Sequence, residues 1–197
     1  MNNVFRACAF LLFIACNSGE SKPGPAQAVD STEKAKAYFP VLDYLQSEIR
    51  YVDSLPVGIM KYTIQNNITD STYIKPEEFH QLAQEFLSPL LNKPTFEKEF
   101  KETSFFDNTT QYSTIFYSTT NTNLPLQRVD VVVKPQNEIY NKVKSVYMEK
   151  HYEKADSSII QKLYWKAGQN FQISAQIRTT KPEVVTRQVK VVWNSWD

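Results

Sequence analysis

Phe171-Gln-Ile-Ser-Ala-Gln-Ile-Arg178 is the stretch of this chain that decides its fold. Apolar side chains occupy every second position from Phe171 to Ile177, and polar side chains stand between them. Successive side chains of a β-strand point to opposite faces of a sheet, so this alternation predicts a strand with one buried and one wet face. Such strands are typical of an antiparallel sheet that is covered on one side.

The same period of two extends outward from this stretch, beginning near residue 100. Val189, Val191 and Trp193 repeat it, and Ala167-Gly168-Gln169 marks a turn between two of the strands. Strands joined by such short turns form an antiparallel meander. We expect strands at about 101–107, 111–119, 127–134, 142–153, 158–166, 170–179 and 184–193.

The chain before residue 100 follows a different period, in which apolar residues recur every three or four positions. This spacing predicts helices over 32–55 and 74–90, with a strand over 58–65 between them. Helices that precede a run of strands define the α+β class. We therefore expect two N-terminal helices packed on a curved antiparallel β-meander of about six to eight strands.

Prolines set the expected limits of these helices. Proline removes a backbone donor and clashes with the preceding turn, so Pro40 should kink or divide the first helix near Phe39. Pro76 suits the first turn of the second helix, where its missing donor costs nothing. We expect Pro89 and Pro94 to stop that helix.

The N-terminal residues have the layout of an export signal. Arg6 is followed by the apolar run 7–15, which is too short to span a bilayer, and then by Cys16. This stretch resembles a bacterial lipoprotein signal, which implies that Cys16 carries lipid. We expect an exported protein anchored to a bacterial membrane, the outer membrane in our interpretation, facing the periplasm or the outside.

The predicted organisation is a signal peptide over 1–15, a lipidated cysteine with a flexible tether over 16–32, and a single α+β domain over 33–197. The tether is rich in proline, glycine and polar residues, which neither pack nor continue a helix. Two alternatives to a lipoprotein signal remain for the N-terminal residues: an ordinary signal peptide that is cleaved at another position, and a buried N-terminal helix.

Three further stretches carry a second resemblance. They are Ser54-Leu-Pro-Val-Gly-Ile-Met-Lys-Tyr62, Lys144-Ser-Val-Tyr-Met-Glu-Lys150 and Lys190-Val-Val-Trp193. With them the domain resembles uncharacterised outer-membrane lipoproteins of the Bacteroidetes type. The resemblance implies a location, and it implies no activity, substrate or catalytic residue.

Composition excludes several function classes. Lys and Arg number 22 and Asp and Glu 21, and loss of Arg6 with the signal balances the charges. A chain without basic excess has no bulk field for nucleic acid, so we expect no nucleic-acid partner. Glycine is too scarce for a phosphate-binding loop, so no cofactor is expected. Lys142 and Lys144 alternate with apolar residues, as on the wet face of a strand.

The residues that could support catalysis or metal binding are few. His80 and His151 lie on different predicted elements, whereas a histidine metal site needs ligands close together, so no metal is expected. His151 could meet Glu149 on one strand face, which leaves a hydrolase as a hypothesis without an assigned catalytic residue. Asp107 fits a turn and Asp130 should face water, so neither favours a glycosidase.

Aromatic residues give the best indication of a binding surface. We single out Tyr147, Tyr164, Trp165 and Trp193, because 13% of the chain is aromatic and several of these residues fall in strands. Alternation places Tyr164 and Trp165 on opposite faces, so one of them is on the non-core face or under another element. A second face with large aromatics either binds something or is covered.

Three Asp-Ser pairs resemble the acceptor motif for O-glycosylation of exported proteins in Bacteroidetes-type bacteria. The acceptors would be Ser31, Ser54 and Ser71, and Ser31 in the tether would be the most accessible. An intact-mass measurement would reveal added sugar.

The sequence leaves three functions open. The leading hypothesis is a lipid-anchored envelope protein with a non-catalytic role, which binds another protein or supports envelope assembly. The alternatives are a carrier of a hydrophobic small molecule or lipid, and a hydrolase around His151. Fold class alone does not decide among them.

Overall fold

The computed structural model describes residues 38–65, 68–134, 142–180 and 184–195. The predicted signal and tether, with Cys16 and Ser31, lie outside these residues. The described part contains three α-helices, α1 (Val41–Asp53), α2 (Pro76–Ala83) and α3 (Lys93–Glu99), and two 3₁₀ turns, Gln84–Phe86 and Pro89–Leu91. Its strands are β1 (Ile59–Gln65), β2 (Ile68–Ile74), β3 (Lys101–Asp107), β4 (Tyr112–Ser118), β5 (Leu126–Val133), β6 (Val143–Lys154), β7 (Ser157–Lys166), β8 (Asn170–Thr179) and β9 (Val184–Val192).

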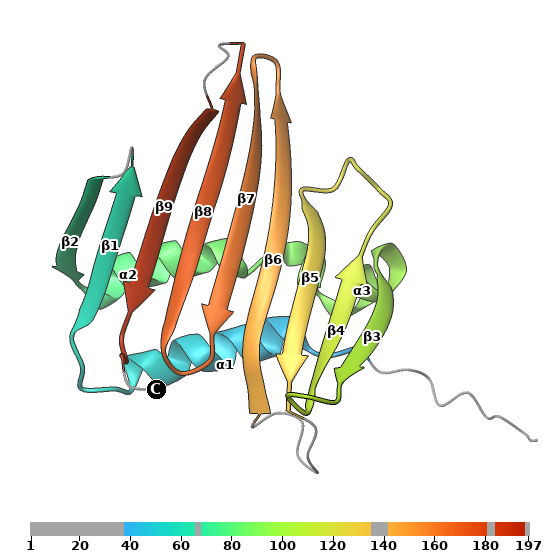
Figure 1. The fold of residues 1–197 in the computed structure, drawn as a ribbon, viewed down its shortest axis with the longest axis horizontal. Helices are drawn as coiled ribbons and strands as arrows, with labels where there is room; N and C mark the ends of the chain where they lie inside the picture. Colours follow the sequence, from blue (N-terminus) through green and yellow to red (C-terminus); the bar gives the residue numbers. More distant parts are fainter. Residues whose placement is uncertain (1–37, 66–67, 135–141, 181–183, 196–197) are drawn as a thin grey trace, which may run out of the picture. The chain divides into compact units, whose positions relative to one another are not determined.

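The strands form one open antiparallel sheet of nine strands in the order β2-β1-β9-β8-β7-β6-β5-β4-β3 (Figure 1). Strands β3 to β9 are a meander, in which each strand pairs with the next one along the chain. The hairpin β1–β2 then joins the far side of β9, where Met60 pairs with Val192. The chain between β2 and β3 therefore crosses the width of the sheet, and α2 and α3 form this crossing.

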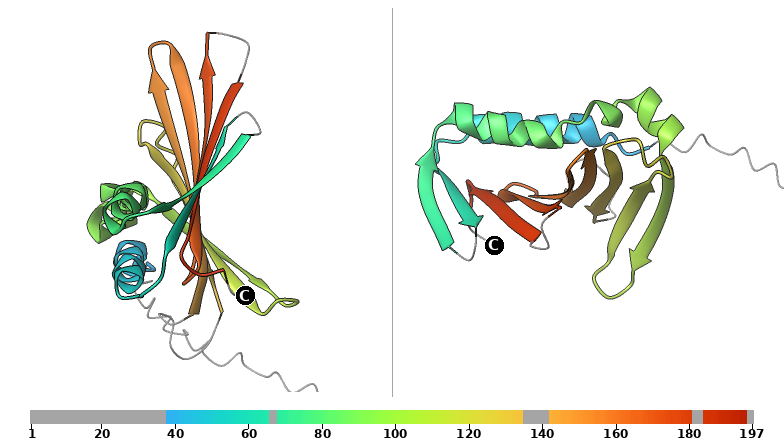
Figure 2. Two further views of the ribbon diagram at one scale, coloured as in Figure 1. Left: turned by 90° about the vertical axis from the view of Figure 1, so that its left-hand side faces the viewer. Right: turned by 90° about the horizontal axis from the view of Figure 1, so that it is seen from above.

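The helices lie on one face of the sheet, and no described helix lies on the other (Figure 2). The apolar stripe of α1 explains its place, because Tyr44, Leu45, Ile49 and Val52 are all buried. We call the face toward the helices the covered face and the opposite one the open face.

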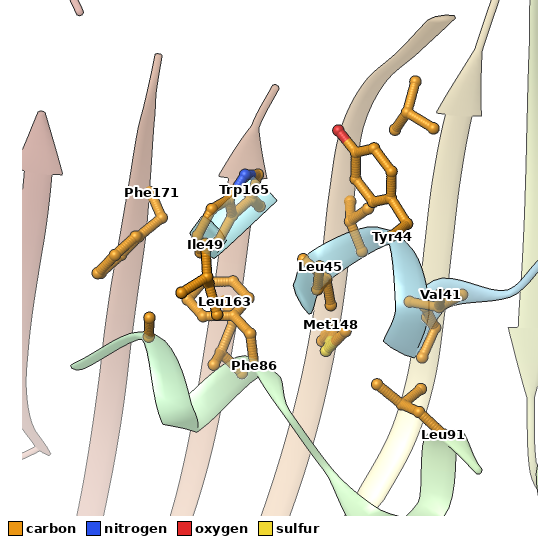
Figure 3. Packing of buried hydrophobic residues seen from close by; sticks show 14 of the residues in the cluster. Val41, Tyr44, Leu45, Ile49, Phe86, Leu91, Met148, Leu163, Trp165 and Phe171 are labelled. Atoms are coloured by element: carbon orange, nitrogen blue, oxygen red, sulfur yellow. The ribbon is translucent and has the colours of Figure 1, made fainter. Parts of the chain in front are cut away.

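Aromatic rings fill the centre of the covered face (Figure 3). Trp165 of β7 stacks on Phe171 of β8, with ring centroids 5.2 Å apart. Phe86 meets Trp165 edge-on at 5.2 Å, and Phe79 lies 5.7 Å from Trp193. Such pairs add about 0.5–1.5 kcal/mol each beyond the area they bury, so this cluster is a main source of stability.

A second aromatic group holds the start of the described chain against the end of the sheet formed by β3 and β4. The backbone N–H of Phe39 donates to the Tyr117 hydroxyl at 2.8 Å, and the Tyr38 hydroxyl donates to the carbonyl of Phe100 at 2.7 Å. Phe96 of α3 packs on Tyr117 with centroids 4.7 Å apart.

Polar contacts also join the helix layer to the sheet. Glu48 of α1 accepts hydrogen bonds from the Trp165 indole at 3.1 Å and from the backbone N–H of Gly168 at 2.8 Å. Lys150 is a buried lysine on the covered face, and its ammonium donates to the backbone carbonyl of Glu85. Burial lowers the pKa of Lys150, partly opposed by the charge of Glu85.

The α+β class and the antiparallel arrangement are confirmed, but the strand count is higher than expected. The seven predicted strands of the meander and the strand over 58–65 are present with small shifts at their ends. The additional strand is β2, which brings the sheet to nine. Six of its seven residues are exposed, so its sequence lacks the alternation that burial on one face produces.

The helix predictions need two corrections. The first helix begins at Val41, directly after Pro40, and Tyr38 and Phe39 are not helical, so no helix runs through Pro40 with a kink; the part predicted over 32–37 lies outside the described residues. The second predicted helix ends as α-helix at Ala83, and α3 follows as a third helix that the sequence did not predict. Pro94 lies in the first turn of α3, where a missing N–H is harmless, and does not act as a stop.

Candidate functional site on the open face

The open face carries a group of polar and aromatic side chains on three neighbouring strands. Val129, Val146 and Leu163 point to the covered face and are buried, so the residues that alternate with them point to the open face. Register places these residues side by side, since Tyr147 pairs with Asp130 on one side and with Tyr164 on the other. We call the following residues the open-face cluster: Arg128, Asp130, Tyr147, Glu149, His151 and Tyr164.

Glu149 is the centre of the cluster, because each of its carboxylate oxygens has a partner on the same strand. The Tyr147 hydroxyl donates to Oε2 at 2.9 Å. Nε2 of His151 lies 2.7 Å from Oε1, in reach for the ring N–H to donate. Residues two apart in a strand share a face, so β6 alone places these three side chains in a row.

Arg128 and Asp130 form a second pair on β5. The Arg128 Nε donates to Oδ1 of Asp130 at 2.7 Å, and the Asp130 side chain is only 13% exposed. The guanidinium also lies over the ring of Phe116, at 5.5 Å from its centroid, and at 6.0 Å from that of Tyr147. Cation–π contacts of this kind hold the guanidinium against the sheet.

These contacts shift the pKa values of Glu149, Tyr147 and Arg128, and each shift favours the protonation state that the group has at neutral pH. Partial burial raises the pKa of Glu149. The hydrogen bonds from His151 and Tyr147 lower it by more than burial raises it, so its pKa lies below the ordinary value. Burial and the hydrogen bond to Glu149 raise the pKa of Tyr147. The hydrogen bond to Asp130 raises the pKa of Arg128. At neutral pH Glu149 is therefore an anion and Tyr147 a neutral donor.

The structure divides the four aromatic residues predicted for a binding surface into two pairs. Tyr147 and Tyr164 are cross-strand neighbours on the open face, where the Tyr164 side chain is 39% exposed. Trp165 and Trp193 are buried on the covered face, at 0% and 4% exposure. Alternation thus separates Tyr164 from Trp165 as the sequence predicted, and the two tryptophans belong to the packed core.

His80 belongs to a different place in the molecule. Its Nε2 lies 2.6 Å from Oδ1 of Asp53, at the junction of α1 and α2. Both residues line a hollow of about 640 Å³ that also contains apolar side chains such as Leu55 and Val57. Glu77 lines the hollow as well, without a hydrogen bond to His80.

The remaining predicted residues are accounted for as follows. Asp107 accepts hydrogen bonds from the Thr109 N–H and the Thr110 hydroxyl, which makes it a turn residue as expected. Ser54 is exposed at the end of α1, and its hydroxyl donates to the carbonyl of Tyr51. Ser71 is exposed on β2. Within the described ranges, no three His, Cys, Asp or Glu side chains are grouped to hold a metal ion.

Sequence reasoning did not find the Arg128–Asp130 pair or the contact between Asp53 and His80. The spacing of Arg128 and Asp130 in one predicted strand was an available signal, because residues two apart share a face. Asp53 and His80 are 27 positions apart on separate helices, and only the packing of α1 on α2 brings them together.

Comparisons of this chain with models of protein families, with curated proteins and with solved structures found no match. Among the described residues, none of the helices has the length and apolar character needed to traverse a bilayer.

Proposed function

We propose that this chain is a lipid-anchored cell-envelope protein with a non-catalytic role, and that it binds a protein partner through the open-face cluster. The observation that carries the proposal is the pair Tyr147–Tyr164. The two tyrosines stand side by side on a sheet face that no described helix covers.

The chemistry of the cluster suits a protein interface. Tyrosine and arginine dominate binding energy at such interfaces because they combine a large apolar surface with a polar end. Tyr147 is already held by Glu149 and Arg128 by Asp130, so these side chains lose little freedom on binding. A partner would gain contact area here without reordering the sheet.

The location rests on the sequence from Arg6 to Cys16, which lies outside the described residues. The intact mass of the protein extracted from membranes tests it. Lipid on Cys16 as the first residue is expected, and a Cys16→Ser variant should leave the membrane fraction. A mature protein without added lipid would contradict the anchor.

A photo-crosslinking residue in place of Tyr164, in the intact chain in its own cells, tests the binding face. Tyr51 is the matched control, because it is similarly exposed, at 48%, but lies on α1. We expect a discrete crosslinked product from position 164 that position 51 does not give, and that Arg128→Ala weakens. Equal products from both positions, or none from 164, would refute the proposal.

A second candidate is a carrier of a hydrophobic small molecule or lipid. The hollow of about 640 Å³ near His80 favours it, because apolar side chains and the Asp53–His80 pair line the same space. Pockets of a few hundred Å³ with few polar groups are typical ligand sites. Native mass spectrometry of gently purified protein would show a bound mass of lipid size, and a bare protein mass would count against this role.

The third candidate is a hydrolase around His151. The contact with Glu149 and a hollow of about 580 Å³ beside His151 are its support. Nucleophilic catalysis also needs a hydroxyl in reach of the base, and no described serine or threonine hydroxyl is hydrogen-bonded to His151. Unchanged fitness of a His151→Ala strain would dispose of this candidate.

A further inference from the structure

Four lysines line one hollow of about 410 Å³ at an end of the sheet. They are Lys134, Lys142, Lys144 and Lys166. The other lining residues are neutral: Tyr112, Val143, Ala167 and Gln169. We call this site the lysine pocket.

The topology of the meander brings these lysines together. Lys134 follows β5, Lys142 and Lys144 stand at the start of β6, and Lys166 ends β7, so all four lie at the lower end of the sheet in Figure 1. The backbone N–H of Lys134 donates to the carbonyl of Lys142 at 3.1 Å. The N–H of Ala167 donates to the carbonyl of Lys144, also at 3.1 Å. These backbone hydrogen bonds fix the positions of the Cα atoms from which the lysine side chains extend.

Three lysines of the pocket, Lys134, Lys142 and Lys144, have no acidic neighbour in the described part of the chain. Lys61, Lys93, Lys98 and Lys150 each have a glutamate within ion-pair distance. No described carboxylate lies at such a distance from Lys134, Lys142 or Lys144, and none lines the hollow.

One lysine is positioned by an aromatic ring. The Lys144 ammonium lies 4.5 Å from the centroid of the Tyr112 ring, which comes from the start of β4. This contact leaves its N–H donors available, because an aromatic face accepts a cation without the directed hydrogen bonds of a carboxylate.

We propose that the lysine pocket binds a phosphomonoester group. Lysines that line one hollow repel one another when no anion lies between them, and a doubly charged phosphate relieves this repulsion for several lysines at once. Lysine is a compact point charge with three donors, which suits phosphate oxygens. The volume is that of a small-ligand site. The site is separate from the open-face cluster and does not depend on its role.

The phosphate could belong to a lipid headgroup or to a soluble compound, and two arms of one experiment distinguish these sources. The first arm titrates the full chain, kept in detergent, with inorganic phosphate and glycerol 3-phosphate by calorimetry. The second arm compares sedimentation with phosphatidylcholine vesicles that contain or lack phosphatidic acid. Only the difference between the two vesicle types is counted, because a lipid anchor would bind to both.

The test variant replaces Lys134, Lys142 and Lys144 with Gln. Its matched control replaces three exposed lysines outside the pocket, Lys75, Lys101 and Lys154, with Gln. Both variants lose the same net charge, so bulk electrostatics cannot explain a difference between them.

The proposal requires that the pocket variant binds phosphate about tenfold or more weakly, because hydrogen bonds to charged groups are each worth more than a tenfold factor. The control variant should bind like the original protein. Binding in the calorimetric arm identifies a soluble phosphate compound, and binding only to vesicles with phosphatidic acid identifies a headgroup. Binding in neither arm, or equal losses in both variants, would overturn the proposal.

Discussion

Glu149 connects two side chains of the open-face cluster, with one carboxylate oxygen toward Tyr147 and the other toward His151. Both contacts favour the ionised carboxylate, and they outweigh its partial burial. The charge of this single residue therefore strengthens the hydrogen bond that holds the Tyr147 hydroxyl in place.

Replacement of Glu149 by Gln should lower the free energy of unfolding by about 1 kcal/mol at neutral pH, because hydrogen bonds to a charged group are lost. The pKa of Glu149 is lower in the folded than in the unfolded protein, so its stabilisation is present above the ordinary glutamate pKa of about 4.3. It disappears as the pH falls through the lower pKa of the folded protein. The difference in the free energy of unfolding between the original protein and Glu149→Gln should therefore become smaller on acidification. Denaturant unfolding at several pH values would measure it.

Glu153→Gln is the control for this prediction, because Glu153 lies on the same strand and is exposed. It should unfold like the original protein at every pH. A difference for Glu149→Gln that stays constant from neutral to acidic pH would contradict the assigned role of the charge.

At this scale the sequence predicted contacts along a strand better than contacts between strands. The meeting of His151 with Glu149 and the opposite faces of Tyr164 and Trp165 follow from alternation alone. The pairing of Tyr147 with Tyr164 depends on the register of β6 and β7, which alternation does not specify. The lysine pocket depends on which strand ends meet, so it could not be predicted from local pattern.

At the scale of elements, α1 is fixed to the sheet by Glu48 as well as by apolar packing. Glu48→Ala should destabilise the protein by about 1–3 kcal/mol, because it leaves the buried Trp165 indole without its acceptor. Thermal and denaturant unfolding would measure the loss. Gln46→Ala on the same helix is the control and should change stability little, and an equal effect of both substitutions would refute the role of Glu48.

The turn between β7 and β8 depends on the backbone of Gly168, which has a φ of 65°. A non-glycine residue in this left-handed conformation costs roughly 1–2 kcal/mol. Gly168→Ala should show that loss in denaturant unfolding, although nothing would touch the added methyl group. Gly168→Asn should lose less, since asparagine tolerates this conformation.

Gly58 provides the matched comparison. An added methyl there would approach the ring of Tyr73 at 3.0 Å, but that side chain is 73% exposed and free to turn away. Gly58→Ala should therefore cost less than Gly168→Ala, and the reverse order would show that contacts rather than backbone conformation dominate.

Strands with one buried face were predictable, whereas the edge strand β2 and the helix α3 were not; the other edge strand, β3, was predicted over 101–107. β8 alternates because the covered face buries Phe171 and Ile173. β2 lies at the edge and exposes nearly all its side chains, so nothing imposes a period on its sequence. α3 was missed because Pro94 acts as a helix stop only when it follows a helix, and here it stands in the first turn.

At the scale of the whole molecule, burial is concentrated in the middle of the sheet. β6 contains five buried residues, whereas β2 contains one and β3 contains none. Local opening needs least free energy where few apolar contacts are lost. Amides in β6, β7 and β8 should therefore exchange with deuterium far more slowly than those in β2 and β3.

Hydrogen-exchange mass spectrometry of the native protein would check this order. Uniform protection across all nine strands would contradict it, and would indicate that the edges open only when the whole sheet unfolds.

The pairing of β1 with β9 has a consequence for the timing of folding. The two strands are separated by about 130 residues, so the ribosome releases β1 long before its partner exists. At 5–20 residues per second, the first hairpin waits roughly 6–25 seconds before β9 can cover the open edge of β1. An unpaired strand edge is a template for pairing with another chain, so this interval is when the incomplete sheet is most exposed to misassembly.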